Sequence, residues 1–179
     1  MSKRLALMSL ATAASLFAGV AIAQDNPKVG GAEMLANKNI VENAVNSKDH
    51  TTLVTAVKAA GLVDTLSGAG PFTVFAPTNA AFGKLPAGTV DTLVKPESKA
   101  TLTKVLTYHV VSGKVTASDL MKMKDGSKIK TVAGEELTVK SPGDKVTLTD
   151  SKGNTATVTI ANVMQSNGVI HVIDTVLMP

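Results

Sequence analysis

Residues 73–82 read Thr-Val-Phe-Ala-Pro-Thr-Asn-Ala-Ala-Phe and join two kinds of local structure. The apolar run Phe72–Ala76 predicts a short strand, and Pro77 ends it because proline has no backbone donor for a sheet. Thr78 or Asn79 can cap the helix that follows, since their side-chain oxygens accept hydrogen bonds from the free amides of a first helical turn. The stretch therefore predicts a strand, a turn and a short helix.

The residues before this stretch favour helices. Asn39 can cap a short helix over residues 40–46. Asp49 can cap a second helix that ends at Ala60, and Gly61 provides its stop signal. The apolar residues of the second helix recur at amphipathic spacing, which predicts that one face packs against a core.

The residues after the stretch change character near Gly126. The segment 96–108 predicts the longest helix, and 118–123 a small one. Beyond them, segments rich in Val, Ile and Thr alternate with turn signals, which is typical of strands. Helices in one half and strands in the other predict an α+β fold. The expected strands are 129–132, 137–139, 146–149, 156–160 and 169–173.

The first 23 residues have the form of an export signal. A basic start precedes an almost wholly apolar run over residues 5–20, and the small-x-small pattern stands at 21–23. We therefore predict cleavage between Ala23 and Gln24. The remaining chain divides into a flexible N-terminal arm and one domain, over 24–38 and 39–179 respectively.

Composition excludes several classes of protein. The leader carries two of the 18 basic residues and none of the 14 acidic ones, so the mature chain is nearly neutral. Nucleic-acid binding needs a basic footprint and stacking aromatics, so it is not expected. The absence of cysteine rules out disulfides and thiolate metal sites. No apolar run after the leader approaches the ~18 residues that would span a bilayer.

Catalytic motifs are missing. His50, His109 and His171 form neither HxxxH nor HExxH, and no GxSxG string is present. We therefore predict a protein that is not an enzyme and needs no cofactor or metal. A group of lysines follows the helical half, and it is either a solvated face or a basic stripe for an acidic polysaccharide or headgroup. Its members are Lys114, Lys122, Lys124, Lys128 and Lys130.

Three strings carry a family resemblance. They are residues 73–82, Leu106-Thr107-Tyr108-His109-Val110-Val111, and the closing run from Asn167 to Asp174. In this order they resemble the boxes of the fasciclin domain, over about residues 40–179. The resemblance implies a β-wedge, a folded antiparallel-rich sheet, with the helices of the N-terminal half packed against it. It also implies a single-domain secreted bacterial type without catalytic machinery, some members of which are linked to symbiosis.

The boxes supply the candidate residues for an interaction site or a structural motif. His109 lies on the apolar stripe of its helix, so it is either a buried histidine that locks the helix end or part of a contact surface with Tyr108. His171 is either a rim residue or a satisfied polar group in the core. Asn162-Val163 stand where animal adhesion members carry Asp-Ile, so integrin recognition is not expected. The candidates are Tyr108, His109, Thr78, Asn79, Asn167, Gly168, His171 and Asp174.

The resemblance and the leader together predict a function outside the cytoplasm. We expect a secreted or periplasmic protein that mediates cell adhesion, or binds a protein or polysaccharide of the cell envelope or extracellular matrix, with host association as one use. The alternative is an extracytoplasmic carrier or sensor of a small apolar ligand. Either protein would be a monomer or a weak oligomer, with no nucleic acid and no integral membrane segment in the mature chain.

Overall fold

The computed structural model describes residues 27–68 and 70–179. Its main sheet has seven strands in the order β4-β3-β9-β8-β7-β6-β5, and a separate two-stranded hairpin precedes it. The strands are β1 (Lys28–Val29), β2 (Ala32–Glu33), β3 (Phe72–Pro77), β4 (Val110–Ser112), β5 (Ser127–Lys130), β6 (Glu136–Lys140), β7 (Thr147–Thr149), β8 (Thr155–Gln165) and β9 (Gly168–Ile173).

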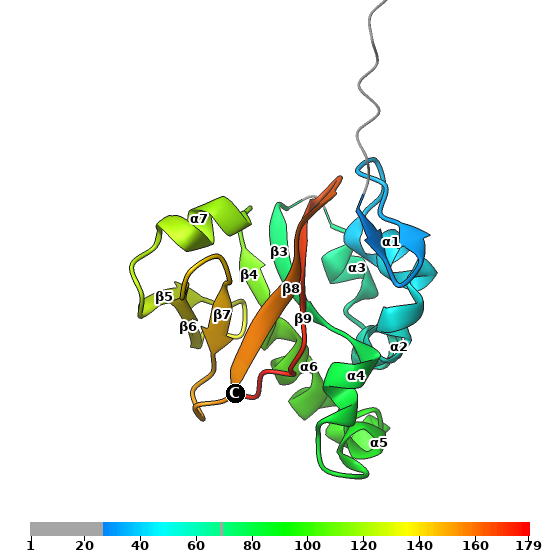
Figure 1. Cartoon of the computed structure of the whole chain (residues 1–179). Helices are drawn as coiled ribbons and strands as arrows, with labels where there is room; N and C mark the ends of the chain where they lie inside the picture. The colour runs from blue at the N-terminus through cyan, green and yellow to red at the C-terminus, as the bar shows by residue number, and fades with distance from the viewer. Residues whose placement is uncertain (1–26, 69) are drawn as a thin grey trace, which may run out of the picture.

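The helices gather in the first two thirds of the described chain, as predicted. Figure 1 shows α1–α3 on one side of the central strands β3, β8 and β9, and β5–β7 with α7 on the other. The helices are α1 (Ile40–Asn46), α2 (Thr51–Ala60), α3 (Val63–Leu66), α4 (Asn79–Gly83), α5 (Thr89–Leu93), α6 (Lys99–Tyr108) and α7 (Ala117–Lys122), with 3-10 turns η1 (Lys48–His50) and η2 (Pro96–Ser98). The predicted α+β class is confirmed.

Two of the three helix caps predicted from the sequence are present in the structure. Asn39 caps α1 in a capping box with Glu42, and Thr78 caps α4 by accepting from the amide of Ala81. The predicted Asp49 cap of α2 is wrong, because η1 intervenes before α2 begins at Thr51. The side chain of Asn79 caps α2 instead, from across the fold, and its Oδ1 lies 3.0 Å from the amide nitrogen of Thr52.

Strands β3, β9 and β8 form the centre of the sheet. β3 runs parallel to β9, with Val74 opposite Ile170, and β8 joins β9 in an antiparallel hairpin. Successive side chains on a strand point to opposite faces. The central strands therefore contribute to two separate hydrophobic cores.

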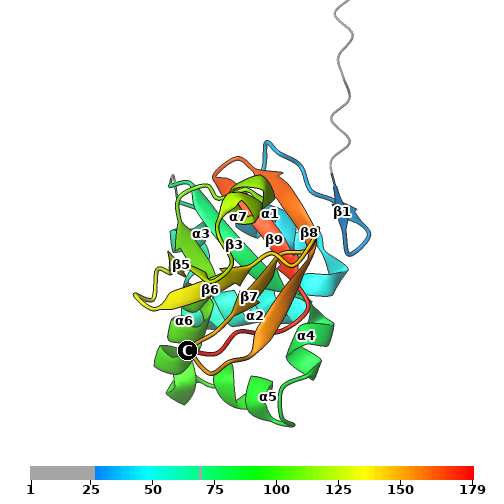
Figure 2. The same ribbon diagram turned by 60° about the vertical axis from the view of Figure 1, so that its left-hand side comes forward.

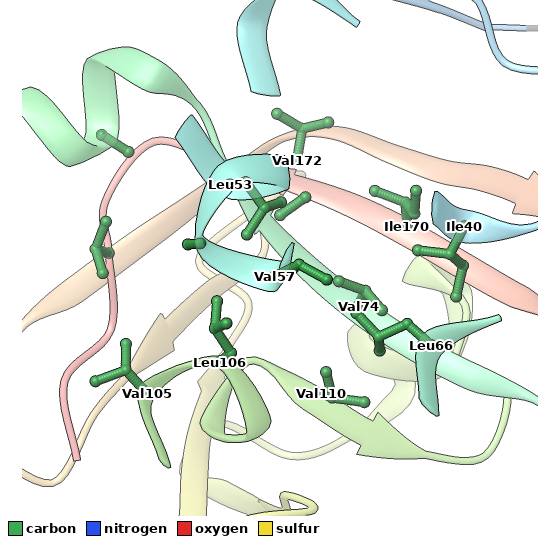
Figure 3. Packing of buried hydrophobic residues seen from close by; sticks show 14 of the residues in the cluster. Ile40, Leu53, Val57, Leu66, Val74, Val105, Leu106, Val110, Ile170 and Val172 are labelled. Atoms are coloured by element: carbon green, nitrogen blue, oxygen red, sulfur yellow. The ribbon is translucent and has the colours of Figure 1, made fainter. Parts of the chain in front are cut away.

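The first core lies between the sheet and the helices. Val74, Ile170 and Val172 belong to it, and they meet Leu53 of α2 and Leu106 of α6. Figure 3 shows these side chains directed toward a common interior. The second core holds Phe75 and Ile173 of the central strands together with side chains of β4–β8 and α7: Val111, Leu120, Ile129, Leu137, Val139, Leu148 and Ala156.

The sheet folds back on itself around the second core. Its two edge strands, β4 and β5, approach each other, and an isolated antiparallel bridge pairs Val111 with Thr131 just beyond β5. The amide of Val132 donates to the carbonyl of Val110 at 2.8 Å. The turned view of Figure 2 shows β5–β7 in front of the central strands. This arrangement matches the expected wedge, and it joins the two edges of the sheet at one bridge.

Residues 27–38 are the described part of the segment that we expected to be a flexible arm, and they pack against the domain. They contain the β1–β2 hairpin, and Val29 and Met34 are buried in the first core. Asn43 of α1 exchanges two hydrogen bonds with the backbone of Leu35 and donates to Gln165 of β8. The hydrogen bonds of Asn43 therefore hold this segment against the domain, and no periodicity in the sequence reveals them. The leader and its cleavage site lie outside the described residues.

Within residues 27–68 and 70–179, no helix combines the length and the apolar character required to cross a membrane.

Replacement of Gly168 by Ala should destabilise the protein severely. A Cβ atom at this position would overlap the carbonyl oxygen of Phe72 and lie 2.8 Å from that residue's backbone nitrogen and carbon. The clash is with backbone of the central β3–β9 pair, so we expect a loss of about 3 kcal/mol or more in unfolding free energy, at the upper end of overpacking effects. Urea unfolding measures it.

Gly83→Ala is the matched control, because no atom lies within 4 Å of the added methyl group there and the backbone is helical. This variant should be as stable as the parent or slightly more stable. Equal stability of the two variants would contradict the close β3–β9 contact.

Candidate functional site

Tyr108 is the last residue of α6 and is completely buried. Its hydroxyl donates to the carbonyl of Glu136 at 3.4 Å and accepts from the amide of Ser151 at 3.1 Å. Burial raises the pKa of the Tyr108 phenol above its usual value, so the group stays protonated at neutral pH. Tyr108 thus connects the helical half to β6 and to the turn after β7.

His109 lies one residue beyond the end of α6 and is also buried. Its Nδ1 donates to the carbonyl of Val105 at 2.8 Å, and its Nε2 accepts from the amide of Leu177 at 3.0 Å. Both ring nitrogens are therefore occupied, and the ring joins the end of α6 to the C-terminal segment. This geometry corresponds to the helix-locking alternative, and the side chains of Tyr108 and His109 are both buried.

His171 is buried on β9, so it is a core residue and not a rim residue. Its ring stacks on Phe75, with the centroids 5.6 Å apart. Nε2 donates to the carbonyl of Val115 at 2.8 Å, and Nδ1 accepts from the amide of Asn162 at 3.3 Å. Asn162 has a left-handed backbone with φ 57°, and its side chain accepts from the first amide of α7. His171 and Asn162 together position α7 against the central sheet.

The closing box contributes two further structural contacts. Asn167 accepts from the amide of Ile40 at 3.1 Å and donates to the carbonyls of Leu66 and Gly68, so one side chain holds α1 and α3 to the β8–β9 turn. Asp174 accepts from the amide of Thr157 at 2.9 Å. With the roles of Thr78, Asn79 and Gly168 given above, all eight predicted residues serve the fold, and they do not converge on one site.

An open hollow on the surface lies beside this internal network. It has a volume of about 480 Å³ and is formed by the β5–β6 hairpin and the turn after β7. We call it the polar hollow, and its lining residues are Lys128, Lys130, Gly134, Glu135, Glu136, Thr138, Asp150 and Ser151. Two of them, Glu136 and Ser151, are the residues whose backbone Tyr108 binds from beneath.

The floor of the polar hollow is fixed by Asp150. Its carboxylate accepts from the amides of Lys152, Asn154 and Met178, at 2.9, 2.8 and 3.0 Å respectively, and from the Asn154 side chain. These bonds hold the turn and the C-terminal segment together. Asp150 is therefore a structural carboxylate, and its acceptor capacity is already used.

The rim of the polar hollow is exposed and carries both signs of charge. Lys128 pairs with Glu136 at 3.2 Å, and Lys104 pairs with Glu135 at 2.7 Å. Such exposed pairs contribute little to stability, about 0–1 kcal/mol each, so a partner can replace them at small cost. Lys130 is exposed and forms no ion pair within the described residues.

The chemistry of this arrangement suits binding. None of the three histidines is among the residues that line the polar hollow. Among the described residues, no group of three or more His, Cys, Asp or Glu could hold a metal ion. Sequence reasoning missed the hollow because its walls come from separate strands and a turn. The signal that was present is the lysine group, two of whose members, Lys128 and Lys130, form part of the wall.

Comparison with known proteins identifies the family. The family model of the fasciclin domain matches residues 48–179, and the chain belongs to this family. It is 54% identical over 140 residues to Protein sll1483 of Synechocystis sp., covering 78% of this chain and 73% of that protein. It is 39% identical over 162 residues to the cell surface glycolipoprotein MPB83 of Mycobacterium bovis, covering 88% of this chain and 68% of the relative.

A solved structure supports the fold. The FAS1 domain pair of the insect cell adhesion molecule Fasciclin I superposes with a TM-score of 0.69 over 79% of this chain, at 18% identity. The match covers 51% of that chain, so the present protein spans about half of the two-domain neighbour. The predicted fasciclin membership and wedge fold are confirmed.

Acidification should destabilise the protein through its buried histidines. Burial lowers the pKa of His109 from 6.5 to about 4, and it lowers the pKa values of His50 and His171 in the same direction. Between these pH values the unfolded chain takes up a proton that the folded chain excludes. The contribution of the buried histidines to the free energy of unfolding is therefore full above about pH 6.5 and decreases toward pH 4. For His109 alone the decrease is about 3 kcal/mol.

Urea unfolding across this pH range, for the parent and for His109→Ala, measures the effect. At neutral pH the variant should lose about 1–3 kcal/mol, because the amide of Leu177 and the carbonyl of Val105 lose their partner. Its further loss on acidification should be smaller than that of the parent. An identical pH dependence in the two proteins would contradict a neutral, buried His109.

Proposed function

We propose that this protein is exported and binds, without catalysis, a protein or polysaccharide of the cell envelope or extracellular matrix, and thereby supports adhesion. Its fasciclin-domain membership and its relation to a cell surface glycolipoprotein support this proposal. The fold neighbour belongs to a cell adhesion molecule, which is consistent with it. Attachment to a host is the narrower form of the same proposal.

The proposal assigns binding to the polar hollow. The observation that carries this assignment is a contrast between two sets of residues. The polar atoms of the motif residues bond within the fold, whereas Lys128 and Lys130 on the rim of the hollow are exposed. An open site lined by donors, acceptors and both charges suits a polar partner. Tyr108 and Asp150 hold the backbone below the rim, so the site is preorganised, which lowers the entropic cost of binding.

Binding to whole cells and extracted matrix tests the assignment. The exported protein is added to both materials, and the saturable bound fraction is measured for the parent and for a Lys128→Glu/Lys130→Glu double variant. We expect the double variant to bind about tenfold more weakly, because the rim loses its two lysine donors and becomes wholly acidic, which removes its electrostatic match to the partner. Prior treatment of the material with protease or with periodate distinguishes a protein partner from a polysaccharide.

The control is Lys48→Glu/Lys95→Glu, which makes the same change in net charge at two exposed lysines on η1 and beyond α5. This variant should bind like the parent. If both double variants bind the cells and the matrix equally well, the hollow is not the binding site. Absence of saturable binding by the parent would overturn the proposed function.

Export is proposed to end with cleavage between Ala23 and Gln24. The basic start, the apolar run and the small residues at 21–23 support it. The intact mass of the exported protein should correspond to a chain that begins at Gln24. Replacement of Ala23 by Arg should block processing, because signal peptidase requires a small residue there, and uncleaved protein should accumulate. Unchanged processing of this variant would contradict the site.

A further inference from the structure

A second concavity lies among the helices, on the opposite side of the central strands from the polar hollow. It runs from the surface between α1, α2 and α3 down to β3, β4 and the end of α6. We call it the apolar slot, and it is independent of the function proposed above. Its lining residues are Ile40, Val41, Ala44, Leu53, Val54, Val57, Lys58, Val63, Leu66, Val74, Phe75, Leu106, His109 and Val110.

The slot leads from a half-buried mouth to a buried interior. Its mouth is formed by Val41, Ala44, Val54 and Val63, whereas its deeper residues Val74 and Leu106 are buried in the first core. The void inside is about 30 Å³, and about 500 Å³ of space lies between the walls when the open mouth is counted. Figure 3 shows Leu53, Val57 and Val74 in the wall between α2 and β3. A void this small admits a single hydrocarbon chain more readily than a ring system.

The lining specifies the chemistry of such a ligand. Apart from one lysine and one histidine, every lining side chain is aliphatic or aromatic. Both nitrogens of His109 are already bonded to backbone, so no polar side-chain atom is available at depth. A ligand that fills the slot must therefore have an apolar body without polar groups, since buried polar groups without partners are unfavourable.

Lys58 determines which end of the ligand faces solvent. It is the single charged residue of the lining, it is exposed, and no acidic residue lines the slot with it. Within the described residues it forms no ion pair. An ammonium group at the mouth of an apolar slot complements a ligand with an anionic head and a hydrocarbon tail.

We propose that the apolar slot binds a long-chain carboxylate, with the acyl chain between α1, α2 and β3 and the carboxylate beside Lys58. The void is smaller than an acyl chain, so binding widens the slot. Its outer walls are the short helices α1 and α3, which have seven and four residues. The α1 wall is held by side-chain contacts of Asn43 and Asn167, and these allow small displacements more readily than a sheet does.

Titration of the exported protein with cis-parinaric acid, a fluorescent long-chain carboxylic acid, tests the proposal. We expect saturable binding with one site per chain. Lys58→Glu should weaken binding of the acid about tenfold, because attraction of the carboxylate becomes repulsion, and should leave binding of its methyl ester unchanged. Lys145→Glu, in the β6–β7 connection, is the charge-matched control and should bind the acid like the parent.

Blocking the slot provides the second arm. Ala44→Phe places a ring in the mouth and should abolish binding of both acid and ester, whereas Ala59→Phe, on the exposed face of α2, should not. Val54→Phe fills the slot from the other wall and should act like Ala44→Phe, and thermal unfolding identifies which blocking variant remains folded. Absence of saturable binding by the parent, or undiminished binding by a folded blocking variant, would overturn the proposal.

Discussion

The parallel pairing of β3 with β9 is the contact on which the rest of the structure depends. It joins β3 to the last strand of the sheet, and the two strands contribute apolar side chains to both cores. Val74 and Ile170 face the helices, whereas Phe75 and His171 face the closed part of the sheet. The β8–β9 hairpin places β9 beside β3, and Gly168 permits the close approach of the two backbones.

Polar side chains that bond to the backbone of distant segments organise this protein in the absence of disulfides. Asn79 reaches from one helix start to cap another, Asn167 ties two helices to a strand turn, and His109 joins α6 to the C-terminal segment. Each contact joins parts of the chain that are distant in sequence, so it specifies the arrangement of elements as well as contributing stability. A buried hydrogen bond contributes only about 1 kcal/mol net, but a lost partner costs more. The residues of the family motifs therefore serve mainly to hold the fold together.

The two candidate binding regions are connected through adjacent residues of one helix end. Tyr108 belongs to the second core and supports the polar hollow through Glu136 and Ser151, whereas His109 closes the base of the apolar slot. Their side chains diverge because the chain turns there from α6 into β4. One short segment therefore lies between a polar, charged concavity and an apolar one.

The sequence by itself determined the export signal pattern, the strand-turn-helix at residues 72–82, the division into helical and strand-rich parts, and family membership. Those features are local, because periodicity, proline and capping side chains act within a few residues. Tertiary structure alone decided that Asn79 caps α2 instead of its own helix, that Val29 and Met34 join the core, and that β4 closes against β5. It also decided where the two concavities lie. The lining of the slot comes from helices and strands between Ile40 and Val110, and the rim of the hollow comes from a hairpin and a later turn, so only packing brings those side chains together.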